Sequence, residues 1–110
     1  MSFNRWLGMT PGDDDATVVL DTRPEHEVMP GTIHFAVLTT LAEVAASQAA
    51  EASIVPSSVQ VQLLRRAVPG RLVAKGIALK RGRRLIVCEG EVRQNDRLVA
   101  KATVQFAVMG

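Results

Sequence analysis

Two hydrophobic patterns divide the chain, and the change between them falls near Pro56. Residues 35–50 are almost continuously apolar, which predicts one long helix that continues to about Ser53 and is buried on nearly every side. The hydroxyl group of Thr32 is well placed to cap the start of this helix. From residue 59 onward, apolar and polar side chains alternate, which is the period of a β-strand.

Short turns separate the later strands from one another. Turn residues occur at Pro69-Gly70, at Arg81-Gly82-Arg83 and at Asn95-Asp96, and such short connections are typical of an antiparallel meander. An earlier strand is expected at residues 16–22, after a short helix at residues 2–9. We therefore predict an α+β fold in which a curved antiparallel sheet wraps one long buried helix.

The other segments and the chain length indicate a simple organisation. Residues 10–15 and 23–31 are rich in turn-forming and acidic side chains and are expected to be loops. The 110 residues contain no internal repeat or linker, which indicates one domain over residues 1–110 with its core at about 16–108. The predicted helix carries more apolar surface than one small sheet can cover, so we expect a homodimer or a homotetramer.

Targeting signals and disulfide bonds are not expected. Residues 1–12 lack the apolar segment of a signal peptide, and the longest apolar run is too short and too polar to span a bilayer. The single cysteine, Cys88, cannot form an internal disulfide bond, and its place in a predicted strand favours a packed side chain over a nucleophile. We therefore expect a cytoplasmic protein without a membrane span.

Charge is distributed unevenly along the chain. Residues 1–57 carry two basic and eight acidic side chains, a balance of −6, whereas residues 58–110 carry eleven and three, a balance of +8. This asymmetry predicts a polyanionic partner for the second half, either a nucleic acid or a phosphorylated small molecule. Phe106 is the only aromatic residue of the basic half, and RNA-binding sheets need exposed aromatic side chains for base stacking. A small phosphorylated ligand is therefore favoured, and no nucleic-acid partner is expected.

Glu43 is the main candidate for chemistry, because it is the only charged side chain within residues 35–50. A carboxylate that is desolvated by a ligand and a partner subunit can act as a general base on water or as a nucleophile. Alternatively, it belongs to a solvated stripe at helical spacing, formed by Thr40, Glu43, Ser47 and Glu51.

A histidine stands at the start of the predicted helix. His34 can orient a carbonyl group near the positive end of the helix dipole, or it simply bonds to the preceding loop. The only other histidine is His26, and two histidines do not make a metal ligand set, so neither a metal nor another cofactor is expected.

The spacing around His34 matches a known motif, which places a glycine three residues before a histidine and an acidic residue nine residues after it. Gly31, His34 and Glu43 hold these positions. The later matches are Leu63-Leu64-Arg65 with Pro69-Gly70, Gly82-Arg83-Arg84-Leu85 at a hairpin, and a closing strand from Leu98 to Phe106. This pattern resembles the hotdog-fold acyl-CoA thioesterase superfamily, in the branch that includes phenylacetic-acid-pathway thioesterases.

The chain departs from this family pattern at three places. These places hold Val28 instead of an asparagine, Phe35-Ala36 instead of paired glycines, and Pro56, with Ser57 and Ser58 beside it, instead of a serine or threonine. The departures concern the reaction more than the fold. The backbone amide that follows the histidine can still donate a hydrogen bond, because this donor does not require a glycine.

The resemblance implies an acyl-CoA thioesterase whose site lies at a dimer interface. In this interpretation Glu43 assists the attack of water on the thioester carbonyl, while His34 and the backbone amide near Phe35 stabilise the oxyanion. The residues expected to bind substrate are Gly31, Ser57, Ser58, Arg65, Gly82, Arg83 and Arg84. The alternative is a hotdog protein that binds an acyl thioester or a related ligand without hydrolysing it, which the missing asparagine and glycines favour.

The basic residues around Gly82 have two interpretations. They either bind the phosphates of coenzyme A or form an ordinary solvated hairpin. The cluster consists of Lys80, Arg81, Arg83 and Arg84, with Arg65 and Arg66 as additions.

Overall fold

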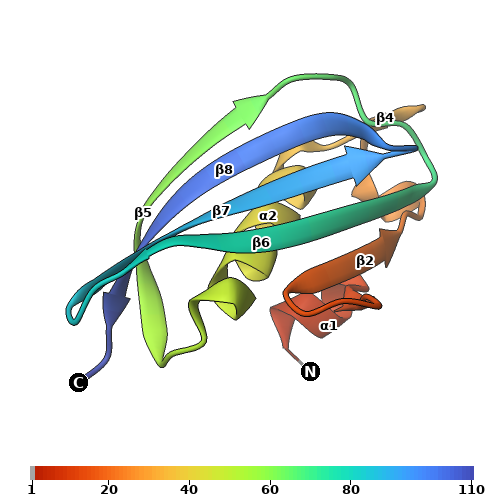
Figure 1. Ribbon diagram of the computed structural model, residues 1–110. Helices are drawn as coiled ribbons and strands as arrows, with labels where there is room; N and C mark the ends of the chain where they lie inside the picture. The colour runs from red at the N-terminus through yellow and green to blue at the C-terminus, as the bar shows by residue number, and fades with distance from the viewer. Residues whose placement is uncertain (1) are drawn as a thin grey trace.

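One long helix lies against one curved antiparallel sheet in the computed structural model, which describes residues 2–110 (Figure 1). The elements in chain order are α1 (Phe3–Leu7), β1 (Thr10–Pro11), β2 (Thr17–Asp21), the 3-10 turn η1 (Pro24–His26), β3 (Glu27–Met29), β4 (Thr32–Ile33), α2 (Phe35–Ala50), β5 (Ile54–Leu63), β6 (Arg71–Arg81), β7 (Leu85–Gln94) and β8 (Arg97–Val108). The predicted α+β hotdog architecture is confirmed.

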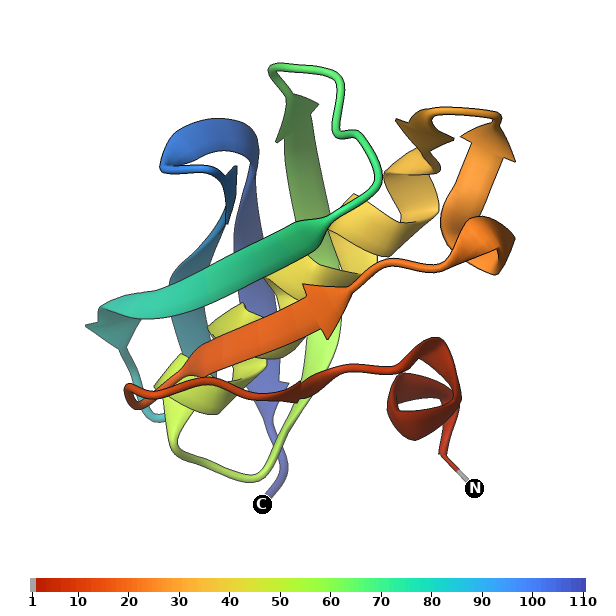
Figure 2. The same cartoon turned by 90° about the vertical axis from the view of Figure 1, so that its right-hand side faces the viewer.

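The main sheet has the strand order β1-β2-β6-β7-β8-β5, and all its pairings are antiparallel. Figure 2 shows how strongly this sheet curls: β2 and β6 cross the view from side to side, whereas β8 and β5 run up and down. Strands β6, β7 and β8 form the predicted meander. The short turn at Pro69-Gly70 led us to expect that β5 pairs with β6 as the first strand of the meander, and this expectation is wrong. Strand β5 pairs with β8 instead, and residues 64–70 carry the chain back to β6.

The boundaries of α2 differ from those expected. Thr32 does not cap the helix, because it lies in β4, where it pairs with Met29 of β3. His34 is the capping residue, and its Nδ1 atom accepts a hydrogen bond from the Ala36 amide at 2.9 Å. The helix ends at Ala50, before the expected Ser53, because Glu51 adopts a left-handed conformation with φ of 52°.

The segments expected to be loops contain short elements. Thr10–Pro11 pairs with β2, and the segment 23–31 holds η1 and β3. Such two- and three-residue strands carry too few side chains for a periodicity of two to be visible. The short N-terminal helix is confirmed, although only Leu7 of its apolar side chains is buried.

Two glycines allow α2 to approach the sheet closely. Gly76 of β6 and Gly90 of β7 are direct cross-strand partners, and Gly90 also pairs with Ala102 of β8. A Cβ atom at Gly76 would overlap the carbonyl oxygen of Ala45, and one at Gly90 would overlap that of Ala42. The helix backbone therefore rests directly on the sheet, and its crossing position is fixed by these small residues.

The two edges of the main sheet differ. One edge is the two-residue strand β1, and the other is the ten-residue strand β5. Val59 and Leu63 of β5 pair with the buried Val104 and Ala100 of β8, so they face the side of the sheet that carries the helix. Both side chains are nevertheless exposed.

None of the helices within residues 2–110 has the length and apolar character needed to cross a bilayer.

We predict that Gly90→Ala destabilises the fold by about 1–3 kcal/mol, because the added methyl group must displace the backbone of Ala42. Urea unfolding measures this change. Gly110→Ala is the control, since its Cβ atom meets nothing within 4 Å. Equal stability of the Gly90 variant and the control would show that the helix does not depend on this contact.

Candidate functional site

His34 is held in one orientation at the start of α2. Its amide donates to the carbonyl oxygen of His26 at 2.9 Å, and its ring nitrogen Nδ1 accepts from the Ala36 amide. Because Nδ1 is an acceptor, the neutral ring carries its proton on Nε2, which is a hydrogen-bond donor. The Phe35 ring stacks on the imidazole at a centroid distance of 4.7 Å. This arrangement presents one side-chain donor at the positive end of the helix.

The first amide of α2 is a second donor at this position. The Ala36 amide is occupied by His34, whereas the Phe35 amide has no hydrogen-bond acceptor within residues 2–110. The Phe35 side chain is 58% exposed and turns away from the core. A helix N-terminus with a free N–H group stabilises negative charge on an oxygen atom. The start of α2 therefore offers two hydrogen-bond donors, the Nε2–H group of His34 and the Phe35 amide.

Glu43 lies on the outer face of α2, about two and a half helical turns beyond His34. It is half-buried, and no hydrogen bond or ion pair engages its carboxylate within the part of the chain that the structure describes. Burial raises the pKa of the Glu43 carboxyl above its ordinary value. A carboxylate that is partly desolvated and unpaired is a stronger base than one in water.

The alternative polar stripe through Glu43 is shorter than expected. The hydroxyl groups of Thr40 and Ser47 donate to carbonyl oxygens of their own helix, at 2.8 and 2.7 Å. Glu51 lies beyond the helix end and places its carboxylate 4.0 Å from Arg81. Glu43 is thus the only ionisable group on the outer face of α2.

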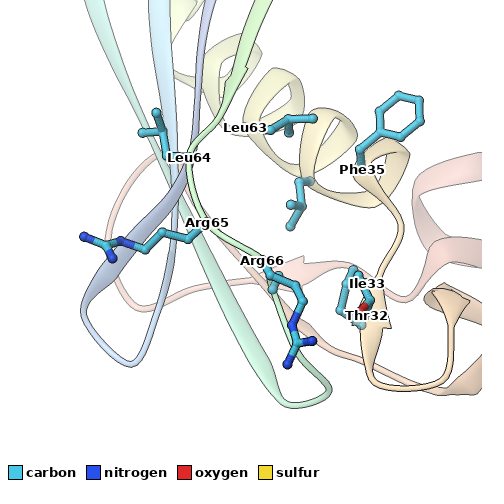
Figure 3. A pocket seen from close by; sticks show the side chains of 9 residues that line it. Thr32, Ile33, Phe35, Leu63, Leu64, Arg65 and Arg66 are labelled. Carbon is cyan, nitrogen blue, oxygen red and sulfur yellow. The ribbon is translucent and has the colours of Figure 1, made fainter.

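A pocket of about 320 Å³ opens beside the start of α2 (Figure 3). Phe35 and Leu38 of the helix line one side, and Leu63 at the end of β5 lines the other. Figure 3 shows the Arg66 guanidinium beside Thr32 and Ile33, while Arg65 points away on the opposite side of the chain. The pocket therefore has an apolar floor and basic groups along its mouth.

The sequence did not single out Arg97 as part of this basic surface. Arg65, Arg66 and Arg97 line an adjoining pocket of about 300 Å³. No carboxylate lies within 4.0 Å of these three guanidinium groups in residues 2–110. Arg97 begins β8 directly after the Asn95-Asp96 turn, so its nearness to Arg65 follows from the β5–β8 pairing and is not visible in the sequence.

Gly31 and the two serines occupy structural positions. Gly31 turns the β3–β4 hairpin with φ of +87° and donates its amide to Glu27 Oε1 at 2.7 Å. Ser57 lies at a bulge in β5, where its hydroxyl group donates to the Gln105 carbonyl oxygen at 3.2 Å. Ser58 is the next residue and is exposed. Both serines lie along β5 toward Ile54, away from the pocket at Leu63.

The hairpin arginines lie far from His34 within one chain. Gly82, Arg83 and Arg84 form the turn between β6 and β7, and Arg81 donates to the carbonyl oxygen of Ala49 at the C-terminal end of α2. Figure 1 shows this hairpin at one end of the molecule and β4, which leads into His34, at the other. The structure thus places Phe35 and Arg65 along one pocket, with His34 adjacent to Phe35, and separates them from the hairpin.

Cys88 is fully buried beneath the helix. Burial raises the pKa of its thiol. A protonated thiol without access to solvent is a poor nucleophile, which agrees with its interpretation as a packed residue.

Comparison with known proteins assigns the chain to a class. Residues 24–107 match the model of the acyl-CoA thioesterase N-terminal domain. The fold and this match define a hotdog protein of the thioesterase superfamily. The chain belongs to the acyl-CoA thioesterase N-terminal domain family. Such membership supports thioester hydrolysis in general. A comparison with curated proteins finds no significant match.

Solved structures agree with this assignment. A mutant of the phenylacetic acid degradation protein PaaI from Thermus thermophilus is 25% identical, with a TM-score of 0.89 over 97% of this chain and 98% of that chain. A Mycobacterium tuberculosis protein, provisionally described as an esterase, is 26% identical, with a TM-score of 0.89 over 97% and 95%. A conserved Pseudomonas aeruginosa protein is 27% identical, with a TM-score of 0.87 over 99% and 94%.

We predict that Glu43→Gln is more stable than the wild type near neutral pH. The raised pKa of Glu43 means that folding disfavours its ionised carboxylate. The contribution of Glu43 to stability is therefore greatest at pH values below its ordinary pKa of 4.5, and it falls as the pH rises through the raised pKa of the folded state. The advantage of the variant should therefore vanish in acid. Thermal unfolding over a pH series tests this, with the exposed Glu51→Gln as control. A variant that is less stable at neutral pH would show that Glu43 makes a stabilising contact.

Proposed function

We propose that the protein hydrolyses acyl-CoA thioesters to a free acid and coenzyme A. The observation that carries this proposal is the pairing of an oxyanion site with a base on one helix. The N-terminus of α2 offers the Phe35 amide and His34 Nε2, and its outer face offers the unpaired, half-buried Glu43. Membership of the thioesterase family supports the reaction class.

The chemistry follows from these groups. The thioester carbonyl oxygen accepts hydrogen bonds from the Phe35 amide and from His34 Nε2–H, which stabilise the negative charge that forms on it. Glu43 accepts a proton from water as the water oxygen bonds to the carbonyl carbon. The tetrahedral intermediate then breaks its carbon–sulfur bond, and the thiolate of coenzyme A takes the proton back from Glu43. The products are a carboxylic acid and a thiol, and the enzyme is unchanged.

The distance along α2 requires two subunits for one site. Phe35 and Glu43 are eight residues apart, which is about 12 Å along a helix, whereas a general base must reach the attacking water within hydrogen-bond distance. A two-fold axis that sets two α2 helices antiparallel brings Glu43 of one subunit to the helix start of the other. The resemblance to hotdog thioesterases implies the same interfacial arrangement.

The β5 edge supports assembly of two or more copies. It is long and open, and Val55, Val59 and Leu63 along it are exposed at 46%, 43% and 51%. An exposed apolar strand edge is an aggregation hazard unless it is covered. Antiparallel pairing of β5 with its copy would cover these side chains and align the helices as the reaction requires. We therefore propose a homodimer as the functional unit, with a homotetramer as a further step.

The same two-fold pairing gives the hairpin arginines a role. In a dimer with this two-fold axis, the partner runs in the opposite direction. Its β6–β7 hairpin would then lie at the end of the assembly where this chain carries His34. We propose that Arg65 and Arg66 bind the phosphates of coenzyme A from one subunit, and that Arg83 and Arg84 contribute from the other. Guanidinium groups without carboxylate partners suit this task.

The rival function is binding of an acyl thioester without hydrolysis. Its support is Val28 and Phe35-Ala36 at positions where related thioesterases have an asparagine and two glycines. Thiol release from a series of acyl-CoAs separates the two functions, because a binding protein retains affinity for an acyl-CoA and releases no thiol.

We predict that Glu43→Gln lowers kcat by about 10²–10⁴-fold, because the amide keeps the shape and loses the base. Glu51→Gln, outside the proposed site, is the control and should keep wild-type activity. Full activity of the Glu43 variant would exclude it as the base.

The shared site is tested with the same variant. Co-expression of Glu43→Gln with His34→Ala should restore part of the activity, because a mixed dimer contains one site with both native residues. No recovery in verified mixed dimers would place both groups in the same subunit.

We also predict that Arg65→Ala/Arg66→Ala raises KM for an acyl-CoA by about tenfold and leaves KM for the matching N-acetylcysteamine thioester nearly unchanged, because exposed charged contacts contribute modestly. Arg83→Ala/Arg84→Ala should act similarly if the partner's hairpin reaches the phosphates. The effect should shrink with added salt. Equal losses on both substrates would show that the arginines support the fold and do not bind phosphate.

A further inference from the structure

A second pocket, of about 240 Å³, lies on the opposite side of the α2 N-terminus from the pocket at Leu63. Phe3, Trp6 and Leu7 of α1 form one wall, and the capping residue His34 with Val37 and Thr40 of α2 forms the other. The N-terminal helix is thus part of a cavity that contains the proposed oxyanion donor.

Hydrogen bonds fix α1 in its place beside His34. The guanidinium group of Arg23 donates to the carbonyl oxygens of Trp6 and Leu7, at 2.7 and 3.2 Å. His26 is 2% exposed; its Nε2 bonds to Leu7 O at 2.8 Å, and its Nδ1 accepts from the Arg23 amide at 3.0 Å. The carbonyl oxygen of His26 in turn accepts from the His34 amide. The wall of the pocket and the helix cap are therefore one connected structure.

Two large aromatic side chains remain exposed at this wall. Phe3 and Trp6 are 59% and 58% exposed, and their ring centroids lie 6.2 Å apart. Exposed aromatic surface beside a cavity is typical of a ligand contact. A cavity of about 150 Å³ accommodates a benzene ring, so this pocket has room for a compact apolar group.

We propose that this pocket binds the acyl group of the substrate and that Trp6 and Phe3 determine which acyl groups are accepted. The proposal rests on the proposed thioesterase function. A carbonyl held by His34 and the Phe35 amide has the Leu63 pocket on one side, toward the unpaired arginines, and the α1 pocket on the other. The phosphates of coenzyme A belong on the basic side, which leaves the apolar side for the acyl group.

Charge at the rim limits the acyl groups further. Glu25 and Glu27 line the pocket entrance, and the single cation there, Arg23, is engaged with backbone carbonyl groups and lies 3.8 Å from Glu25. An acyl group that ends in a carboxylate meets net negative charge at this rim, whereas an uncharged apolar acyl group does not. We therefore expect hexanoyl-CoA to be preferred over succinyl-CoA.

A binding measurement tests the pocket without hydrolysis. Trp6 is the only tryptophan in the chain, so intrinsic fluorescence reports on this wall alone. The thioether S-hexyl-CoA should shift or quench the emission at saturation, whereas S-methyl-CoA, which is too short to fill the pocket, should leave it nearly unchanged. Equal responses to the two thioethers would overturn the proposal, as would S-hexyl-CoA binding with no response.

Kinetics provide the second test. Trp6→Ala should lower the ratio of kcat/KM for hexanoyl-CoA to that for acetyl-CoA by about tenfold, which is about 1.4 kcal/mol, and Trp6→Phe should restore most of it. Leu79→Ala, which truncates another exposed apolar side chain, on β6, should keep the wild-type ratio. Circular dichroism confirms that each variant is folded. An unchanged ratio in folded Trp6→Ala overturns the proposal.

The outcomes separate this proposal from the proposed function. A fluorescence response to S-hexyl-CoA without thiol release from hexanoyl-CoA supports the pocket and overturns hydrolysis. Thiol release with an unchanged ratio and a silent tryptophan supports hydrolysis and overturns the pocket.

Discussion

The direct contact between the backbone of α2 and the glycine pair of the sheet is the constraint on which the rest of the structure depends. Gly76 and Gly90 remove the side chains that would otherwise hold a helix farther from a sheet. The helix is therefore fixed in both position and rotation, because only its alanine-rich side fits this approach. Its opposite side, which carries Glu43, must face outward. The outward position of Glu43 is thus a consequence of how the alanine-rich side of the same helix packs against Gly76 and Gly90.

The start of the helix is fixed by polar contacts. His34 caps α2 with its ring and ties the helix to His26 through its backbone, and the ring of His26 holds α1. The buried ring of His26 has both nitrogens bonded, so a displacement of this segment would leave one of them without a partner. The ring of His34 can therefore present its remaining proton in a defined direction before a substrate arrives, which reduces the reorganisation needed in the transition state.

The sequence predicted the fold well because its periodicities are long and unmixed. The apolar run through α2 and the alternation in the last three strands are sufficient to predict one long helix wrapped by a curved antiparallel sheet. The resemblance to hotdog thioesterases adds the name of the fold and the nine-residue interval that selects His34 and Glu43 as candidates. The sequence could not predict which residues meet. Thr32 is the suitable cap by residue type, yet the β3–β4 pairing holds it in a strand and leaves the cap to His34. Arg83 and Arg65 look equivalent in a basic half, yet they lie at opposite ends of the sheet.

The unequal edges of the sheet also govern how the protein behaves in a crowded solution. Addition of strands is possible only where a long row of unpaired backbone groups is available, and each copy has one such row, at β5, while the β1 edge is only two residues long. Once two β5 edges have paired, neither copy has a second edge of that kind to offer. Sheet growth then stops at a closed pair and cannot continue into a fibre. The short N-terminal strand thus protects the molecule against polymerisation.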